Sequence, residues 1–355
     1  MSNINRRKVI ACAAATGALA VAPRSLAHEV ATAGTWTPRA DMPFPVQEIY
    51  PAPFWKSSAA GQTLKPTPFN IIVNAGGLSP GGAYNVSDDT VWYDPVTDQW
   101  DYGTSLPAPR HHLMLVNNNG FLYGIGGFAR DARGGWQMTA DCWRIDEING
   151  AWAPMRSMPH PQAEAVCQSL AGFIHVVGGR APAGSRNSDW SDHIDTDEHW
   201  VYDAGADRWR DLAPLPTPRN STAGVVLRGV LYVIGGRTVR DGNSTAVEVY
   251  DPLSDRWEKA RPMPKAQGGL AAAALGGKIY VFGGEYFSGG GGGVFADTWE
   301  YDPRADQWRA VAPMPRPRHG LGAVTLGKSI YVLGGAAKAG GDETSPAVDA
   351  FNINP

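Results

Sequence analysis

The sequence predicts an all-β fold, and three recurring features lead to this prediction. A pair of glycines closes a short apolar run six times along the chain, at intervals of about 50 residues. Between the pairs, an alternating strand that ends in Tyr-Asp or a near relative is followed by a short polar turn and a tryptophan. A further apolar run and a tight turn then lead to the next glycine pair. Four strands per unit and six units predict a six-bladed β-propeller.

The glycine pairs close apolar runs such as "FLYGIGG" (121–127) and "VLYVIGG" (230–236). Continuous apolar runs of this length suit strands that are covered on both faces. A phosphate-binding glycine loop is normally built once and opens a helix, so six copies indicate a structural role. The pairs are Gly76-Gly77, Gly126-Gly127, Gly178-Gly179, Gly235-Gly236, Gly283-Gly284 and Gly334-Gly335. We expect the longer glycine run from Gly289 to Gly293 to belong to a flexible loop.

The outer part of each unit is predicted to be a hairpin. Segments such as "VEVYDPLSDRW" (247–257) and "TWEYDPRADQW" (298–308) place Asp-Pro and small polar residues between two strands. Proline presets φ for a turn, and aspartate bonds to its own backbone there. The large tyrosine and tryptophan side chains can fill the wedge that opens as neighbouring blades splay outward.

The two ends of the repeat region complete each other. The sixth unit ends in "AVDAFNINP" (347–355), a strand with no tryptophan after it, whereas "TWTPRADMP" (35–43) has the tryptophan but no strand before it. We therefore expect the segment around Trp36 to form the outer strand of the last blade. This pairing would close the ring and hide the sheet edges.

The first 27 residues predict a signal for export. Arg6, Arg7 and Lys8 precede a weakly apolar run, and the small residues of "SLA" end at Ala27. "RRKVI" also resembles a twin-arginine motif. The expected organisation is a signal peptide over 1–27 and a propeller over 28–355, in a periplasmic or secreted protein. No other stretch reaches the roughly 20 apolar residues of a membrane span.

Composition excludes several classes of partner and cofactor. The net charge is −3, and no basic stripe or zinc-finger spacing is present, so we expect no nucleic acid partner. Cys142 and Cys167 are too few for a disulfide scaffold, and we favour two buried thiols over a single bridge. The sequence predicts no cofactor and leaves a metal ion as an open alternative.

The double glycine, the tyrosine six or seven residues before a tryptophan, and the repeat length resemble the kelch-repeat family over residues 36–354. This resemblance implies a kelch β-propeller. Among exported bacterial members, the chain is similar to the periplasmic sialic-acid mutarotases (N-acetylneuraminate epimerases) in its size, its signal peptide and its blade number. That resemblance implies a carbohydrate epimerase or mutarotase, an isomerase, with Glu285 as its catalytic acid or base.

Binding residues are expected on one face of the ring. The loops after the glycine pairs are long, and antiparallel topology places them on the same face as the links between blades. Their guanidinium, imidazole and amide groups suit a sugar, a sugar acid or an acidic peptide. The predicted ligand-binding residues are Arg110, His111, Arg180, Arg219, Asn220, Arg237, Arg318 and His319, with Gln47, Glu48, Gln162 and Gln267 at aligned link positions.

A metal site is the further alternative. The segment "SDWSDHIDTDEHW" (188–200) gathers His193, Asp195 and His199, residue types that bind transition metals. Charge runs are usually solvated, so an acidic surface loop is the preferred interpretation. The functional hypotheses are thus a ligand-binding propeller with epimerase or mutarotase activity, a non-catalytic protein-binding propeller, and a metal-dependent lyase or isomerase.

Overall fold

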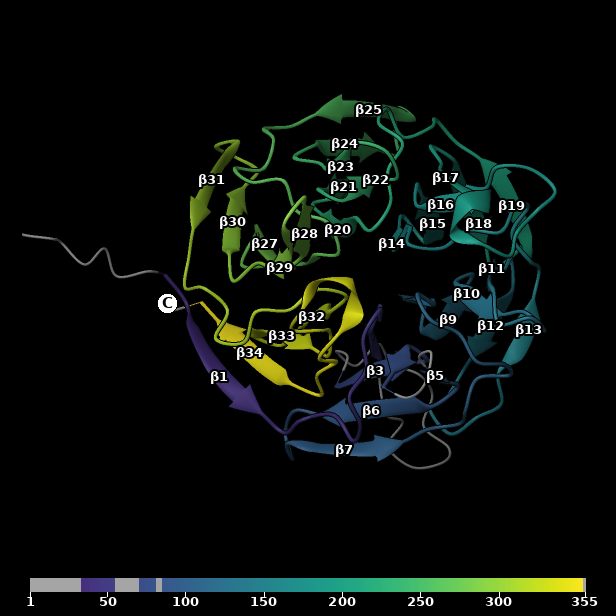
Figure 1. Ribbon diagram of the computed structural model, residues 1–355, viewed down its shortest axis with the longest axis horizontal. Coiled ribbons are helices and arrows are strands. Elements are labelled where there is room, and N and C mark those ends of the chain that lie inside the picture. The colour runs from purple at the N-terminus through teal and green to yellow at the C-terminus, as the bar shows by residue number, and fades with distance from the viewer. Residues whose placement is uncertain (1–32, 55–69, 81–84, 354–355) are drawn as a thin grey trace, which may run out of the picture. The chain divides into compact units, whose positions relative to one another are not determined.

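The protein forms a ring of six four-stranded antiparallel sheets (Figure 1). The computed structural model describes residues 33–54, 70–80 and 85–353. Contacts between the innermost strands link each sheet to the next around the whole ring. The predicted six-bladed propeller is confirmed. The signal peptide predicted for residues 1–27 lies outside the described residues.

In blades 1 to 3 the chain begins with the innermost strand and proceeds outward. Blade 1 holds β2 (Ala52–Phe54), β3 (Ile71–Ala75), β6 (Thr90–Asp94) and β7 (Gln99–Tyr102). Blade 2 holds β8 (Met114–Asn118), β9 (Phe121–Ile125), β12 (Cys142–Ile145) and β13 (Ala153–Met155). Blade 3 holds β14 (Val166–Leu170), β15 (Phe173–Val177), β18 (His199–Asp203) and β19 (Arg208–Asp211).

Blades 4 to 6 have the same arrangement, except that the outermost strand of blade 6 comes from the N-terminal part of the chain. Blade 4 holds β20 (Ala223–Leu227), β21 (Val230–Ile234), β24 (Val247–Asp251) and β25 (Arg256–Lys259). Blade 5 holds β26 (Ala271–Leu275), β27 (Lys278–Phe282), β30 (Thr298–Asp302) and β31 (Gln307–Ala310). Blade 6 holds β32 (Gly322–Leu326), β33 (Ser329–Leu333), β34 (Val348–Asn352) and β1 (Thr35–Arg39).

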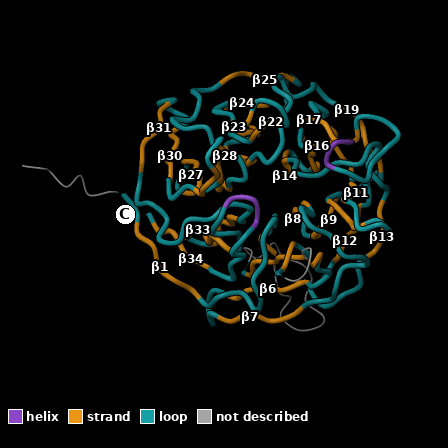
Figure 2. Tube along the Cα trace, in the orientation of Figure 1, coloured by secondary structure: helices purple, strands orange, loops and turns teal. Residues whose placement is uncertain are grey.

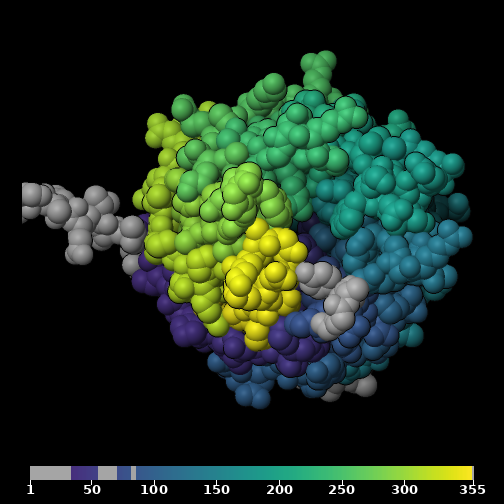
Figure 3. All heavy atoms as spheres, viewed as in Figure 1, coloured from purple at the N-terminus to yellow at the C-terminus, as the bar shows by residue number. Residues whose placement is uncertain are grey.

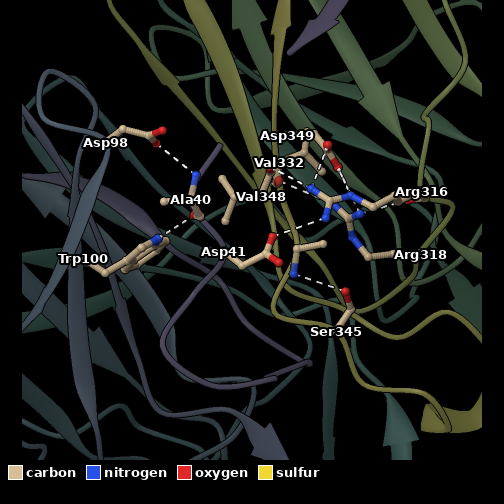
Figure 4. A network of polar contacts seen from close by, with 11 residues as sticks. Ala40, Asp41, Asp98, Trp100, Arg316, Arg318, Val332, Ser345, Val348 and Asp349 are labelled. Atoms are coloured by element: carbon tan, nitrogen blue, oxygen red, sulfur yellow. Dashed lines mark hydrogen bonds and ion pairs between the residues drawn. The ribbon is translucent and has the colours of Figure 1, made fainter. Parts of the chain in front are cut away.

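The ring closes at blade 6, where the segment around Trp36 supplies the outermost strand, as predicted. Trp36 lies opposite Phe351 in the β1–β34 pair. Its indole Nε1 donates a hydrogen bond to the carbonyl of Ala312 in blade 5, at 2.9 Å. The chain after β1 is held on both sides: Ala40 bonds to Asp98 and Trp100 of blade 1, and Asp41 pairs with Arg316 (Figure 4).

The tryptophan of the repeat makes the same contact in every blade, and the tyrosine does so in blades 1, 3, 4 and 5. The tyrosine hydroxyl donates to an aspartate five residues later, as in Tyr202 to Asp207 at 2.6 Å and Tyr301 to Asp306 at 2.6 Å. The tryptophan Nε1 donates to a backbone carbonyl of the preceding blade. These indole bonds join Trp100 to Ala40, Trp152 to Thr104, Trp209 to Arg156, Trp257 to Ala213 and Trp308 to Arg261.

The glycine pairs fasten each blade to the next. The N–H of the second glycine donates to the carbonyl of the residue that opens the following link, as in Gly284 to Arg318 at 2.9 Å. The first glycine, Gly283, has φ +62°, and a Cβ there would lie 2.2 Å from the Arg318 carbonyl oxygen. A side chain would therefore separate the two blades, which explains why both positions are glycine.

Small hairpins stand on one face of the ring directly after the glycine pairs. In the described residues they are β4 (Leu78–Ser79) with β5 (Asn85–Val86), β10 (Phe128–Arg130) with β11 (Trp136–Met138), β16 (Arg180–Pro182) with β17 (His193–Asp195), β22 (Arg237–Thr238) with β23 (Gly242–Asn243), and β28 (Glu285–Ser288) with β29 (Gly291–Val294). Two 3-10 turns, η1 (Trp190–Asp192) and η2 (Ala339–Gly341), lie on the same face (Figure 2). The expectation of a flexible loop over Gly289 to Gly293 was wrong for Gly291 to Gly293, which lie in β29.

Apolar side chains fill the spaces between neighbouring blades. One cluster joins Val73 of blade 1 to Leu115 of blade 2, and another joins Tyr123 of blade 2 to Tyr202 of blade 3. The thiols of Cys142 and Cys167 are buried in this second cluster and are not bonded to each other. Among the described residues, no helix has the length and hydropathy of a membrane span.

Candidate functional site

A cavity of about 760 Å³ opens at the centre of the face that carries the hairpins. The surface is hollowed there beside the C-terminal blade, which is yellow in Figure 3. The links between blades form the floor of the cavity, and the hairpins form its walls. The polar and aromatic residues of its lining include Gln47, Glu48, His111, His112, Trp136, Glu164, Arg180, Trp190, Arg237, Asn243, Glu285, Tyr286, Phe287 and His319.

A link is the segment between the outermost strand of one blade and the innermost strand of the next. Each link contains three successive residues with different roles. The first accepts the glycine N–H described above, and the second pairs its backbone with the residue after the glycine pair of its own blade, as in His111 with Phe128. The third has a positive φ, which turns the chain into the innermost strand. The third residues are Glu48, His112, Glu164, Ser221, Gly269 and Gly320.

The third residues are joined to one another by their backbones around the axis of the ring. In five of the six links, the N–H group of the third residue donates to the carbonyl of the third residue of the preceding blade. The bonds run from His112 to Glu48, Ser221 to Glu164, Gly269 to Ser221, Gly320 to Gly269 and Glu48 to Gly320, at 2.7 to 3.0 Å. This belt forms the rigid floor on which the side chains of Glu48, His112 and Glu164 stand.

Ion pairs connect the floor to the walls. Arg180 Nε lies 3.4 Å from Glu164 Oε1, and Arg237 pairs with Glu285. The second oxygen of Glu285 accepts the N–H of Gly340 at 2.9 Å. Because Glu164 and Glu285 are buried to 1% and 2% exposure, these carboxylates are stabilised by partners rather than by bulk water.

Three histidines complete the inner part of the cavity. His112 Nε2 lies 2.7 Å from Glu48 Oε2, and its Nδ1 lies 2.7 Å from Nδ1 of His111, so one of these two Nδ1 atoms must carry the shared proton. His319 Nε2 donates to the carbonyl of Lys338 at 3.0 Å, and its Nδ1 lies 3.5 Å from Glu285. Polar hydrogen-bonding groups thus surround the cavity on all sides of the ring axis.

Neighbouring charges keep the floor carboxylates ionised. Burial alone would raise the pKa of Glu48, but His112, His319 and Arg237 hold it at about 2. Burial would likewise raise the pKa of Glu164, and Arg180, His112 and Arg237 hold it at about 2. Both side chains are therefore anionic at neutral pH.

Burial keeps two neighbouring groups, His111 and Tyr50, in their neutral forms. Burial, followed by the neighbouring His112, holds the pKa of the His111 imidazole well below its usual 6.5. Burial, followed by Glu164 and Glu48, raises the pKa of the Tyr50 phenol well above 10. His111 and Tyr50 are therefore neutral at pH 7, and His111, which lines the cavity, can take part in hydrogen bonds without adding charge to it.

Of the residues predicted from the sequence, seven line the cavity together: Gln47, Glu48, His111, Arg180, Arg237, Glu285 and His319. The expected gathering of the other arginines at the rim needs correction. Arg219 and Arg318 are fully buried and pair with Glu248 and Asp349, the latter pair shown in Figure 4. Each of these two arginines fastens its link to the blade that follows it. Arg219, for example, pairs with Glu248 of blade 4, and its Nε donates to the carbonyl of Gly235 in the same blade.

Arg110 and Asn220 also lie outside the cavity lining. Arg110 pairs with Asp141 and stacks over Trp143, with 4.9 Å from its guanidinium carbon to the ring centroid. Asn220 donates to Asp195 at 2.5 Å. The amides of Gln162 and Gln267 donate to the carbonyls of Gly178 and Gly283, so these link glutamines are structural as well.

The residues considered for a metal do not converge. His193 is buried beside Phe128 and Trp190. Asp195 accepts from Asn220 and from the backbone of Val239, whereas His199 bonds to His175 within blade 3. In residues 33–54, 70–80 and 85–353 no group of three or more His, Cys, Asp or Glu side chains is placed to hold a metal ion. The described residues therefore lend the metal-dependent hypothesis no support.

Sequence reasoning missed His112 and Glu164, and it placed Glu48 one position out of register. The glycine bonding shows that Val46, not Gln47, corresponds to Arg110, so Glu48 corresponds to His112. Extending the repeat alignment by one residue would have revealed these positions, because the aligned residues in blades 5 and 6, Gly269 and Gly320, are typical of a positive φ.

Comparison with known proteins agrees with this architecture. The family profile described as the KLHDC2/KLHL20/DRC7 Kelch-repeats domain matches residues 68–284 and 172–353. The chain is 28% identical over 287 residues to "Kelch-like protein terF" of Aspergillus terreus, covering 78% of this chain and 61% of that protein. It is 30% identical over 274 residues to "Kelch-like protein 36" of Rattus norvegicus, covering 74% and 42%. The chain thus spans roughly half the length of these curated relatives.

A solved structure shares the fold. The protein described in "Structure of YjhT" superposes with a TM-score of 0.69 at 16% sequence identity, over 88% of this chain and 96% of that one. At this identity the likeness concerns the fold alone. The family profile covers most of the chain, all six blades carry the double glycine and tryptophan contacts described above, and blades 1, 3, 4 and 5 carry the tyrosine contact. The chain therefore belongs to the kelch-repeat family.

Proposed function

We propose that the cavity binds a small hydroxylated ligand of the sugar class. The observation that carries this proposal is the arrangement of buried, paired charges on its floor. In the Arg180–Glu164 and Arg237–Glu285 pairs, N–H donors lie directly beside carboxylate acceptors. A sugar hydroxyl both donates and accepts, so neighbouring hydroxyls can bond to both members of such a pair.

The charge balance favours a neutral sugar over a sugar acid. The inner part of the cavity holds three carboxylates, Glu48, Glu164 and Glu285, and two guanidinium groups, Arg180 and Arg237. Both arginines already have a carboxylate partner. Arg240 and Asp241, which are exposed on the β22–β23 hairpin, add one charge of each sign. A ligand carboxylate would have to compete with Glu164 or Glu285 for a guanidinium group that is already paired, whereas a neutral hydroxyl would not.

The same residues support an exchange of anomers as the reaction. In that reaction a base takes the proton of the anomeric hydroxyl, an acid protonates the ring oxygen, and the ring C–O bond opens to an aldehyde or ketone that closes again on either face. Glu285 lines the cavity and is held by Arg237 and by the N–H of Gly340. We assign it the role of the proton-transfer group. Export directed by residues 1–27 stays part of the proposal.

Exchange NMR on reducing sugars tests this function. We expect the protein to accelerate anomer exchange of at least one sugar in a panel of glucose, galactose, mannose, N-acetylglucosamine and N-acetylneuraminate. Glu285→Gln should slow the accelerated rate about 100-fold or more. Glu258→Gln is the matched control, because Glu258 is exposed on the outer strand β25. Equal rates for the wild type and Glu285→Gln would refute the catalytic assignment.

A non-catalytic protein-binding propeller is the second candidate. Apolar side chains exposed around the cavity mouth, such as Phe287 and Trp190, favour it. The curated relatives are Kelch-like proteins, of which this chain spans only part. The three inner carboxylates argue against the acidic peptide expected from the sequence. A stoichiometric partner recovered from the source organism, whose binding is unaffected by Glu285→Gln, would favour this candidate.

A further inference from the structure

Four large apolar side chains are exposed at the mouth of the cavity. Trp190, Val239, Tyr286 and Phe287 are 44%, 45%, 42% and 62% exposed, and all four belong to the cavity lining. They come from the hairpins and the η1 turn of blades 3, 4 and 5, which are consecutive in the ring. We call these four residues the apolar rim. An exposed apolar group of this kind above a polar floor marks a binding surface.

The glycine run of β29 allows the apolar rim to form. In the β28–β29 hairpin Tyr286 lies opposite Gly293, and Phe287 lies opposite Gly292. A Cβ at Gly293 would lie 2.7 Å from the Tyr286 hydroxyl oxygen. A Cβ at Gly292 would lie 2.7 Å from the Tyr286 carbonyl oxygen, 2.8 Å from the Ala339 Cβ and 3.3 Å from Phe287. Both aromatic rings therefore rest on a strand without side chains, and substitution there would displace them.

Arg180 connects the apolar rim to the floor. Its guanidinium carbon lies 4.7 Å from the ring centroid of Trp190, and its Nε lies 3.4 Å from Glu164. A group that is bonded to the floor and extends outward along Arg180 would therefore meet the rim. The cavity, at about 760 Å³, lies within the range that takes drug-sized ligands and exceeds the needs of one sugar ring.

We propose that the natural ligand is a sugar that carries an apolar aryl or alkyl substituent. The sugar ring lies against the charged floor, and the substituent lies against the apolar rim. This inference rests on the proposed sugar-binding function and adds the class of ligand. It explains why buried ion pairs and exposed aromatic residues occur in one cavity, since a ligand with a polar and an apolar end uses both.

Calorimetric titration of the full chain with paired glycosides tests the inference. The probes are the methyl and phenyl β-glycosides of glucose, galactose, mannose and N-acetylglucosamine. Binding is the readout, because a glycoside has no free anomeric hydroxyl to exchange. For the sugar that binds, we expect the phenyl glycoside to bind about tenfold more tightly than the methyl glycoside.

Variants of the apolar rim distinguish the contribution of the substituent to the affinity from that of the sugar ring. Phe287→Ser and Gly292→Ala should remove most of the phenyl advantage and leave methyl glycoside binding within about twofold. Val239→Ser, on another hairpin, should reduce the phenyl advantage independently. Gly290→Ala is the matched control, because a Cβ there would have no atom within 4 Å among the described residues. It should change neither affinity. Circular dichroism melting verifies that each variant is folded.

The outcomes distinguish this inference from the proposed function. If methyl glycosides bind and phenyl glycosides bind no more tightly, the inference on the substituent fails and sugar binding stands. If the phenyl advantage survives in Phe287→Ser, Gly292→Ala and Val239→Ser, the rim is not its cause and the inference fails. Binding of cellobiose as tight as that of the phenyl glucoside would also overturn it, since the rim would then accept a second sugar. If none of the glycosides and free sugars binds, the proposed function itself is refuted.

Discussion

Glu164 has both a structural role in the repeat and a place in the lining of the cavity. Its backbone carbonyl accepts from Ser221 in the belt around the axis, while its carboxylate accepts from the Ser221 hydroxyl at 2.6 Å and pairs with Arg180. The left-handed conformation at this position directs the side chain of Glu164 into the cavity. A position that forms a turn in every blade thus carries a side chain that lines the cavity in three of them.

The pKa values of Glu48 and Glu164 predict how acid affects stability. Both lie at about 2 in the folded protein, below the ordinary value of 4.5. A depressed folded pKa stabilises the protein above pH 4.5, and this contribution is lost as the pH falls from 4.5 toward 2. The complete loss is roughly 3 kcal/mol for each residue, and about 2 kcal/mol of it falls between pH 6 and pH 3. Urea unfolding at pH 6 and pH 3 measures it.

The comparison of Glu164→Gln with the wild type isolates the effect. The variant should lose about 2 kcal/mol less unfolding free energy between pH 6 and pH 3 than the wild type does, because its amide does not titrate. Glu258→Gln, which removes an exposed carboxylate from β25, serves as the control. An identical loss in the wild type and in Glu164→Gln would show that Glu164 is not held ionised by its neighbours.

The side chains that follow a glycine pair lie on the face where the sequence placed them, whereas several side chains of the links do not. Arg180, Arg237 and Glu285 come directly after a glycine pair and line the cavity, as expected. Arg110, Arg219 and Arg318 share a link position, but the carbonyl of that position bonds to the preceding blade. This directs their side chains into the sheet interfaces. Sequence alone does not reveal the direction, because it depends on backbone geometry between two blades.

At the scale of elements, the outer strand of each blade is held by its tryptophan. The indole N–H reaches a carbonyl of the neighbouring blade, and the ring lies beside the repeat tyrosine, with 4.8 Å between the ring centroids of Tyr202 and Trp209. In blade 6 Trp36 makes the same indole bond, and its ring contacts Phe282 and Phe351. In blades 1 to 5 the tryptophan and the rest of the blade come from one stretch of the chain. In blade 6 the tryptophan comes from β1, far away in the sequence, and makes the equivalent contacts.

Substitution of Trp36 tests this closure. Trp36→Phe keeps an aromatic ring but removes the bond to Ala312, and should lower the free energy of unfolding by about 1 kcal/mol. Trp36→Ala also removes the packing against Phe282 and Phe351 and should lower it by about 3 kcal/mol. Urea denaturation monitored by circular dichroism gives both values. Unfolding free energies equal to that of the wild type would show that β1 does not contribute to the ring.

The four strands of each blade were predictable from the repeat, whereas the small hairpins were not. Alternation and continuous apolar runs identify strands of about five residues. The strands of the hairpins after the glycine pairs are only two to four residues long, and β29 consists mostly of glycine. Such segments have no apolar period, and glycine has low strand propensity. They pair because the glycine pairs and links hold their ends close together.

At the scale of the whole molecule, six similar sheets depend on one another for burial. Each sheet covers its faces only against its two neighbours, and the belt of third link residues joins the blades around the axis. The number of blades and the closing strand could be predicted from the sequence, because the repeat occurs six times and its two ends are complementary. The cavity could not be predicted in detail, since its lining comes from five of the six links and several hairpins.

Loss of the closing strand should affect the whole ring. Deletion of residues 28–44 removes β1 and leaves β34 as an exposed edge, so we expect the melting temperature to fall by about 5 °C or more. Differential scanning calorimetry measures the change. A melting temperature equal to that of the full chain would contradict the closure that Figures 1 and 4 show.

The central claim is that paired charges on the floor of the cavity bind a sugar. A crystal structure of the protein with the tightest-binding sugar from the titrations tests it most directly. We predict that ring hydroxyls lie within hydrogen-bond distance of Glu164, Arg180 or Arg237. A sugar bound elsewhere on the ring, with these three side chains still paired only with each other and with Glu285, would contradict the account.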